Sequence, residues 1–525
     1  MKILYFFYKN ISKPGIYLGL VFAITFFATC VCANFIVFER GNLLFPAFWL
    51  IGFSILIFNV AYNLVCSFYY LITKPYVLKE MKLKTIPPCA IIYPVRNESF
   101  GLYERMKYTL SNNNLPGVRL CFLSDSDRDY LEYERKVVKR LRSKFGREKI
   151  YYWHRETPEE RKQGNIKEWL IHHYKEFEYF IVCDADSMLP KGALLKLIKK
   201  AEHPKNKDIA MFQTRIEVAH AKTLFSRWQA ISTRIVQKLY TETNQRIFGC
   251  SPSFGHGNLI RVKSFLKIEI PKGILSHDIW DMALLNQKGL RTVYCPDVVS
   301  YEEAPSNYLG MRLRDRRWIK GNFQTFPLLT ARNLSVGARF YIFYGLYMYI
   351  TQAVFLAWII LSLLGSSLLF GQYLFFKPLI FSEQNTLNIP MTAMAITILG
   401  TVFFHKFVIC RSAEDAIDIV KEIFFSTLIC LNNIFYQSLD IITIAFQKLA
   451  WKPAEKNPYE LLSIKRTVKN FWPSTALGLF MLFFGIINTP YGALFAMPII
   501  LSFTLSIPII YITALPWPLK LTIDR

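Results

Sequence analysis

The sequence predicts an α/β domain with a mostly parallel sheet, inserted between α-helical segments that cross a membrane. Apolar runs of about 20 residues, the length that a bilayer requires, lie near both ends of the 525-residue chain. Residues 75–339 lie between them, contain no such run and carry most of the charge. Within that stretch, short strand-like runs alternate with helical stretches, which is the pattern of βαβ units.

Composition indicates a membrane protein rather than a nucleic-acid-binding protein. Hydrophobic residues make up 52% of the chain and aromatic residues 16%, which is high for a soluble protein. The formal net charge is +25. Membrane proteins gather lysine and arginine in their cytoplasmic loops, so we attribute this charge to loops at the inner face of a lipid bilayer. We expect no nucleic acid among the partners.

Residues 1–74 are predicted to form an N-terminal transmembrane hairpin. Its two spans lie near 16–38 and 44–71, with a short polar turn between them. Lys74 and Lys79 follow the second span and place that end in the cytosol. Both ends of the hairpin are therefore expected to be cytoplasmic.

The remaining chain divides into two parts. Residues 75–339 are predicted to form a cytoplasmic domain, and residues 340–525 to form C-terminal transmembrane helices together with interfacial helices. The C-terminal apolar runs lie near 340–370, 389–410, 471–487 and 492–513. With the hairpin they give about six crossings, and both termini are expected inside.

One segment of this last part is ambiguous. Residues 423–446 are apolar but contain Asn432, Asn433, Gln437 and Asp440, and lysines lie on both flanks. A simple crossing would leave one basic flank outside the cell. We therefore favour an interfacial helix or a broken helix pair at the cytoplasmic face, while a crossing stays an alternative.

Four short apolar runs predict strands of the sheet. They lie at 90–93, 119–123, 179–183 and 209–212. The clearest helical stretches between them are 131–145 and 191–201. This alternation favours parallel strands joined by helices.

The strand at 179–183 ends in Asp184-Ala185-Asp186. In an α/β sheet, ligands bind beyond the carboxyl ends of the strands, and side chains two residues apart on a strand share a face. Two carboxylates at this spacing suit Mg²⁺ or Mn²⁺ shared with a substrate diphosphate. The alternative is a polar turn after a buried strand.

Two earlier strand ends carry similar polar residues. Asn97 and Glu98 follow the first strand and have the groups to bond a ribose or a base edge. Asp125 follows the second strand. Each motif taken alone is also consistent with an ordinary turn.

Two loops add further candidates. Lys162-Gln163-Gly164-Asn165 precedes a helix that we expect to begin near Ile166, where a lysine and a helix N-terminus suit a diphosphate. A solvated loop with a capping Asn165 is the alternative. The small residues of 253–258 would let a sugar or another chain approach the backbone closely.

The last two motifs combine acid, base and aromatic groups. Asp278 opens an apparent helix, as a cap or as a general base. Arg314, Arg317 and Trp318 belong to a cationic cluster in which guanidinium groups neutralise a leaving diphosphate and an indole stacks on a sugar. A basic helix that binds anionic lipid would look similar.

The order of these motifs resembles the processive membrane glycosyltransferases of family 2, such as cellulose and hyaluronan synthases. The signature of that family is an early Asp, D-x-D, T-E-D and Q-x-x-R-W, in this order. The similar stretches of this chain are, in the same order, Asp125, Asp184-Ala185-Asp186, Ser276-His277-Asp278 and the run from Arg314 to Trp318. The T-E-D is Ser-His-Asp in this chain, and the Gln is Arg314.

Those departures resemble a narrower group, the bacterial glucans biosynthesis glucosyltransferases H. The similar motifs include Leu-Ser-Asp-Ser, Asp-Ala-Asp-Ser-Met, Ile-Leu-Ser-His-Asp and Arg-Asp-Arg-Arg-Trp, and the resemblance covers roughly residues 85–515. It implies a GT-A-like nucleotide-sugar-binding domain and a multi-pass protein of the bacterial inner membrane. The implied reaction polymerises glucose from UDP-glucose onto a growing β-1,2-linked osmoregulated periplasmic glucan.

The resemblance also implies roles for the candidate residues. Asp278 becomes the base in an inverting transfer, Trp318 orients the acceptor with help from the loop at 255–258, and Arg314, Arg317 and Lys162 neutralise the leaving UDP. The residues expected to bind nucleotide are Asn97, Glu98, Asp125, Lys162, Asn165 and Asp184. The residues expected to hold Mg²⁺ (or Mn²⁺) are Asp186 and Asp184.

Several alternatives remain open. The polymer could be cellulose, chitin or hyaluronan, made from another UDP-sugar. A transporter would not explain the charged domain with its ordered polar motifs. A third alternative is an inactive relative that senses UDP-glucose. The family is also associated with acyl carrier protein, which the resemblance adds as a partner although no residue of the chain indicates the contact.

Overall fold

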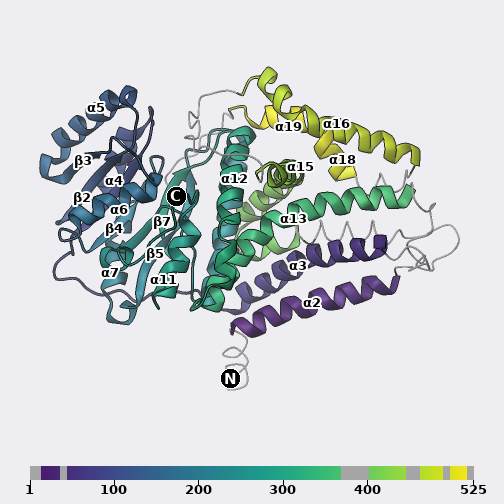
Figure 1. The fold of residues 1–525 in the computed structure, drawn as a ribbon, viewed down its shortest axis with the longest axis horizontal. Coiled ribbons are helices and arrows are strands. Elements are labelled where there is room, and N and C mark those ends of the chain that lie inside the picture. Colours follow the sequence, from purple (N-terminus) through teal and green to yellow (C-terminus); the bar gives the residue numbers. More distant parts are fainter. Residues whose placement is uncertain are drawn as a thin grey trace.

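The computed structural model describes residues 13–35, 44–367, 400, 403–444, 462–488 and 497–516. A sheet domain and a group of long apolar helices lie side by side, with α12 (Tyr308–Phe323) and α15 (Ala413–Ile444) between them (Figure 1). The domain expected over residues 75–339 thus sits in sequence between apolar helices, as the alternation of apolar and charged stretches predicted.

Among the residues that the structure describes, five helices are long and apolar enough to cross a membrane. Four of them are α2 (Pro14–Phe35), α3 (Leu44–Ile72), α13 (Val336–Ser367) and α16 (Ile464–Asn488), and the fifth is α15. The span expected near 389–410 falls largely outside the described residues. The run expected at 492–513 forms two short helices, α18 (Met497–Thr504) and α19 (Ser506–Thr513).

Helix α15 differs from the other four. It is continuous over 32 residues, so the expectation of a broken helix pair within 423–446 is wrong. Its polar side chains have partners inside the protein: the Asn432 amide donates to the Ser502 carbonyl oxygen at 2.9 Å, and Asp440 faces two arginines of α12. In Figure 1 α15 is seen end-on, whereas α2, α3, α13 and α16 run across the view. Helix α15 therefore crosses the direction of those helices.

In the described part of the chain, seven strands form one sheet in the order β3-β2-β1-β4-β6-β5-β7. Their bounds are Cys89–Val95 (β1), Val118–Ser124 (β2), Ile150–His154 (β3), Tyr179–Val182 (β4), Ile209–Ala219 (β5), Asn258–Arg261 (β6) and Arg291–Glu303 (β7). Strand β6 is antiparallel to β4 and β5, and the other pairs are parallel. The mostly parallel sheet is confirmed, and β3, β6 and β7 add to the four strands that the apolar runs predicted.

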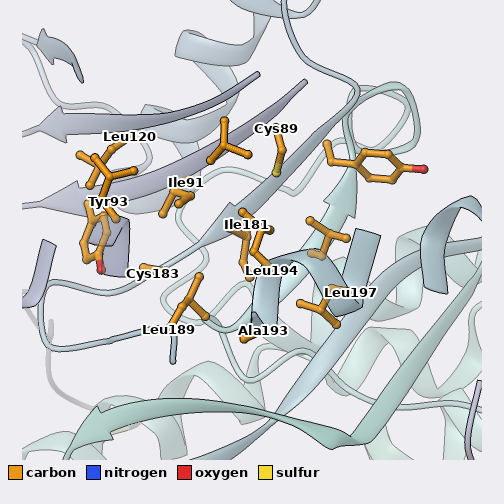
Figure 2. Packing of buried hydrophobic residues seen from close by; sticks show 14 of the residues in the cluster. Cys89, Ile91, Tyr93, Leu120, Ile181, Cys183, Leu189, Ala193, Leu194 and Leu197 are labelled. Atoms are coloured by element: carbon orange, nitrogen blue, oxygen red, sulfur yellow. The ribbon is translucent and has the colours of Figure 1, made fainter. Parts of the chain in front are cut away.

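Helices cover both faces of this sheet. One face carries α4 (Leu102–Asn112), α5 (Arg128–Phe145) and α7 (Ala193–Glu202). The other carries α6 (Arg161–His173), α10 (Val262–Phe265) and α11 (Asp278–Gln287). Figure 2 shows the first of these cores, where Ile91, Ile181 and Leu194 meet. Each strand alternates its side chains between the two cores, as the pleat of a strand requires.

The domain joins the apolar helices through a second set of elements. Helices α8 (Leu224–Ile235) and α9 (Glu242–Phe248), with a π-helical turn at Val236–Thr241 between them, pack toward α3 and α15. The Trp228 indole donates to Ser426 Oγ on α15 at 3.0 Å. Short 3-10 turns lie at Arg147–Lys149, Pro204–Asn206, Phe326–Thr330 and Phe404–Ile409.

Candidate active site

The two acids of the D-x-D motif follow the carboxyl end of β4. Cys183 is fully buried between sheet and helix, and Asp184 is the first residue beyond it (Figure 2 labels Cys183). The Tyr93 hydroxyl donates to the Ser187 carbonyl oxygen at 3.0 Å, and the Ser187 amide donates to the Asp184 carbonyl oxygen at 2.8 Å. The backbone after the strand is therefore fixed. The Asp184 side chain is 34% exposed, whereas Asp186 is buried.

Lys162 connects the D-x-D motif to the small-residue loop. Helix α6 begins at Arg161, so the Lys-Gln-Gly-Asn motif forms its first turn rather than a loop before it, and the expected start near Ile166 is wrong. The Lys162 ammonium donates to Asp184 Oδ1 at 2.5 Å and to the Gly255 carbonyl oxygen at 2.7 Å. One lysine thus holds an acid of β4 against the loop before β6.

Asp278 lies against the same loop. It is the first residue of α11, as predicted, and the Ser276 hydroxyl donates to its Oδ2 at 3.0 Å. Gly255 has a positive φ of 83°, and a Cβ on it would come within 2.8 Å of Asp278 Oδ1. Asp278, Gly255, Lys162 and Asp184 therefore form a continuous chain of contacts. We refer to these four residues and Asp186 as the open corner.

A contact between His277 and Asp281 lies next to Asp278. His277 Nδ1 lies 2.8 Å from Asp281 Oδ2 and 3.6 Å from Asp278 Oδ1. Burial lowers the pKa of His277, but the charges of Asp281 and Asp278 raise it by a larger amount. The net shift of the pKa is therefore upward. The segment that presents Asp278 is thereby tied to its own helix by a favourable electrostatic contact.

Helix α12 brings the arginines and tryptophan to this region. Gly321 packs on Ser276, where a Cβ would come within 2.4 Å of the serine Cβ. The Arg314 guanidinium lies 4.4 Å from the ring centroid of Trp318, which is 42% exposed. Burial and the neighbouring Arg314 lower the pKa of Arg317, whereas the charge of Asp184 raises it. Two partly desolvated cations beside an acid suit an anionic ligand.

Asp125 lies in a different environment from Asp184. The Arg155 guanidinium grips both of its oxygens at 2.7 Å, and the Asn165 amide donates to Oδ1 at 2.9 Å. The side chains of Asp125 and Arg155 are only 4% and 3% exposed. Burial raises the pKa of Asp125, and the bonds from Arg155 oppose that shift. We refer to Asp125, Arg155 and Asn165 as the closed corner.

The residues after β1 bridge neighbouring loops. The Asn97 side chain donates to Asp127 Oδ2 at 2.7 Å and accepts from the Asp127 amide at 2.8 Å. Asn97 adopts a positive φ of 56°, a conformation that asparagine tolerates. Glu98 is half-buried next to it. These contacts join Asn97 to the loop after β2, beside the closed corner rather than the open one.

The loop at 255–258 uses its backbone more than its side chains. The side chains of His256 and Asn258 are buried. His256 contacts Ser187 Oγ at 3.0 Å and Glu302 Oε2 at 2.9 Å. Burial lowers the pKa of His256, but the hydrogen bond and charge of Glu302 raise it by more, so the net shift is upward.

Sequence reasoning missed both Arg155 and the His256–Glu302 pair. Arg155 follows β3, a strand too short and polar for its apolar pattern to stand out. Glu302 belongs to the Tyr-Glu-Glu sequence of β7, whose alternation of side chains is a signal that could have placed it on the sheet. Their partners, Asp125 and His256, lie far away in the chain.

The open corner fits a metal ion only in part. Within the described ranges no three His, Cys, Asp or Glu side chains gather as a metal site. Asp184 and Asp186 supply hard oxygen donors, which suit Mg²⁺ or Mn²⁺ when substrate phosphates and water complete the coordination. The donor set therefore fits an ion that arrives with a diphosphate.

Comparison with known proteins shows what the domain is similar to. Residues 179–405 match the family model "Glycosyl transferase family group 2". The chain is 33% identical over 257 residues to glucans biosynthesis glucosyltransferase H of Bradyrhizobium diazoefficiens, covering 46% of this chain and 34% of that protein. It is 24% identical over 462 residues to the protein of the same name in Xanthomonas campestris pv. campestris strain B100, covering 81% and 71%.

A further relative has the same name. Glucosyltransferase H of Rhodopseudomonas palustris strain BisA53 is 33% identical over 296 residues, covering 53% of this chain and 41% of that protein. The chain thus matches less than half the length of the Bradyrhizobium and Rhodopseudomonas relatives. Among solved structures, the mannosyltransferase PcManGT of Pyrobaculum calidifontis in complex with GDP-Man and Mn²⁺ has a TM-score of 0.48 and 11% identity, covering 76% of this chain and 99% of that chain.

The family match begins at β4 and includes the D-x-D acids, Asp278 and the arginines of α12. The sheet domain has a mostly parallel sheet that presents strand-end acids at one edge. The resemblance carried by the motifs is thereby confirmed: residues 179–405 match a model of family 2 glycosyl transferases, and the chain is similar to the bacterial glucans biosynthesis glucosyltransferases H.

Proposed function

We propose that this protein is an inverting glucosyltransferase of the bacterial inner membrane that polymerises glucose from UDP-glucose into a β-1,2-linked glucan. The observation that carries the proposal is the open corner itself. A base candidate, a pair of acids and a lysine from three separate elements meet there, and α12 brings two arginines beside them. A nucleotide-sugar transfer needs this combination of groups.

The chemistry assigns one role to each group. Asp278 accepts the proton of the acceptor hydroxyl as its oxygen forms the new bond to the anomeric carbon of glucose. The bond from that carbon to UDP breaks in the same displacement, and the electron pair leaves with the diphosphate. Arg314, Arg317 and Lys162 lower the cost of the charge that develops on the departing UDP.

A divalent ion completes the donor site in this proposal. When bound, Mg²⁺ or Mn²⁺ supplies positive charge to the diphosphate oxygens. Asp186 would bind the ion directly. Asp184, which already accepts a hydrogen bond from Lys162, would help to position the ion and its ligands. Trp318, exposed beside Arg314, offers an aromatic face for the acceptor sugar.

The closed corner has a supporting role in the proposal. Asp125 and Asn165 lie on the same side of α6 as Lys162, so they set where the nucleotide meets the sheet edge. Asn97 and Glu98 would define the outer limit of the nucleotide site.

The apolar helices place the reaction at a membrane. We propose that α15 lies at the cytoplasmic face, since it crosses the direction of the other long helices and exposes the apolar side chains Ile417, Phe424 and Ile442. The catalytic domain would then face the cytosol, where UDP-glucose is available. The glucan would be translocated across the bilayer. Acyl carrier protein would bind on the cytosolic side.

The deciding experiment is product analysis with the purified protein. The protein in detergent is incubated with Mn²⁺ and radiolabelled UDP-glucose, UDP-N-acetylglucosamine or UDP-glucuronic acid, and any polymer is subjected to linkage analysis. We expect a polymer from UDP-glucose alone, with 1,2 linkages. A 1,4-linked product or another donor would overturn the linkage or donor assignment, and UDP binding without transfer would indicate a sensor.

A further inference from the structure

The arginines of α12 face two different directions. Arg314 and Arg317 lie on the side of Trp318 and Asp184, as the cation–π contact and the electrostatic influence on Arg317 indicate. Arg312 and Arg316, one helical turn apart, lie on the opposite side of the helix. The nitrogen atoms of both approach Asp440 Oδ1 of α15 at 3.5 Å. The cluster that the sequence presents as one basic patch is thus divided.

Asp440 occupies a protected position. Its side chain is 4% exposed, although it belongs to a helix that is apolar enough to cross a membrane. One carboxylate therefore faces two guanidinium groups with little water around them. An ionised carboxylate in such surroundings needs cationic partners, and removal of one member of a buried pair leaves the other charge uncompensated.

Neighbouring side chains extend the same contact along α15. The Gln437 amide donates to Asp315 Oδ2 at 3.2 Å. The Arg312 guanidinium also lies 4.2 Å from the ring centroid of Tyr436. One turn of α15 therefore holds one turn of α12 through a carboxylate, an amide and an aromatic ring.

This contact fixes the rotation of α12 about its own axis. Arg312 and Arg316 are four residues apart and reach the same carboxylate, so a rotation of the helix would break at least one of the two approaches. Because Arg314 and Arg317 project from the opposite side, the same rotation would turn them away from Asp184. The orientation of the cations at the open corner thus depends on a residue of α15.

We propose that Asp440 is a positioning residue for the transfer reaction. It acts through Arg312 and Arg316 to aim Arg314 and Arg317 at the diphosphate of the donor. The inference rests on the proposed function, because it concerns the cations that would bind UDP. It assigns to α15 a part in donor binding that neither the family motifs nor the named relatives indicate.

The test compares Asp440→Asn with Asp440→Glu in the full-length purified protein. The dissociation constant for UDP with Mn²⁺ is measured by calorimetry, and KM and kcat are measured with UDP-glucose. We expect Asp440→Asn to raise the UDP dissociation constant and the KM about tenfold or more, because small misplacements of binding groups cost this much. Asp440→Glu, which keeps the charge, should recover most of the loss.

Asp418→Asn is the matched control. Asp418 lies on the same helix and bonds Arg234 Nη2 of α8 at 2.7 Å, away from α12. We expect this variant to keep the wild-type dissociation constant. A purely structural role for Asp440 would reduce the fraction of binding-competent protein but leave the dissociation constant of that fraction unchanged, and this result would overturn the inference.

Two further outcomes are distinguishable. Wild-type protein that binds neither UDP nor UDP-glucose would overturn the proposed function, and the inference with it. If Asp440→Asn does not fold, Arg316→Gln replaces it, since Arg312 remains beside Asp440 in that variant. Arg316→Gln should also raise the UDP dissociation constant, and an unchanged value would overturn the inference alone.

Discussion

Asp125 and Asp184 both follow apolar strands of the same sheet, yet their side chains lie in opposite environments. In the closed corner, Asp125 is 4% exposed and gripped at both oxygens by Arg155. In the open corner, Asp184 is 34% exposed and bonded to Lys162, whose flexible stem allows it to move. The closed corner is built for rigidity, and the open corner retains groups that a ligand can reach.

The difference teaches that a strand-end acid is not by itself a binding group. Partners from elsewhere decide its role: Arg155 follows β3, and Asn165 lies one turn after Lys162 on α6. The same helix therefore supplies the amide that closes one corner and the ammonium that serves the other. If this division is correct, substitutions at the two corners should separate activity from stability.

The largest effect is expected at the proposed base. Asp278→Asn removes the proton acceptor but keeps the shape of the side chain, so glucose transfer should fall about 100- to 10,000-fold. The dissociation constant for UDP should stay near the wild-type value. Both are measured on the same preparation, by radiolabel incorporation and calorimetry. Transfer at near wild-type rate would show that another residue is the base.

The next largest effect should fall on stability, at the closed corner. Arg155→Gln leaves Asp125 buried without its cation, which should destabilise the domain by about 3–5 kcal/mol. Thermal unfolding in detergent measures the change. Arg119→Gln is the matched control, because the Arg119–Glu176 pair at 2.9 Å has both side chains 38% exposed. Equal losses in the two variants would contradict the distinction between the corners.

Asp186→Ala should affect metal-dependent binding without unfolding the domain. We expect UDP affinity in Mn²⁺ to fall about 10- to 100-fold, whereas the weaker binding in chelator should not change. Asp208→Ala is the control, since Asp208 pairs with Arg291 at the opposite edge of the sheet. An unchanged affinity in Mn²⁺ would remove the metal assignment from Asp186.

Arg317→Lys tests the geometry of the cation rather than its charge. An ammonium cannot reproduce the planar two-point grip of a guanidinium on a diphosphate. The loss of one charge-assisted hydrogen bond corresponds to about a tenfold drop in kcat/KM for UDP-glucose. Arg332→Lys, on an exposed loop, should have no effect. A fully active Arg317→Lys would indicate that a point charge is sufficient.

The smallest expected effect is a pH dependence at the open corner. The pKa of His277 is raised in the folded protein by Asp281 and Asp278, in spite of burial. Its contribution to stability is therefore complete below the pKa of the unfolded chain and is lost as pH rises through the folded value. Between pH 6 and pH 9 the unfolding temperature should fall more in the wild type than in His277→Gln. The exposed His172→Gln variant should keep the wild-type slope, and parallel slopes for all three proteins would argue against the histidine contact.

The sequence alone determined the local elements of this protein. The alternation of apolar runs and helical stretches identified β1, β2, β4 and β5 with α5 and α7, because burial on both faces of a parallel sheet leaves a continuous apolar signal. The same physics identified the apolar helices by length. The order of the polar motifs was sufficient to indicate the glycosyltransferase family.

Only the tertiary structure decided which polar groups meet. The partners of Arg155, Glu302 and Asp440 carry no local signal, because a charged residue has the same appearance in a sequence whether water or a buried partner surrounds it. The start of α6 at Arg161 and the continuity of α15 were likewise visible only in the structure. Propensity and periodicity describe neighbours along the chain, whereas a site depends on electrostatic partners brought together by packing.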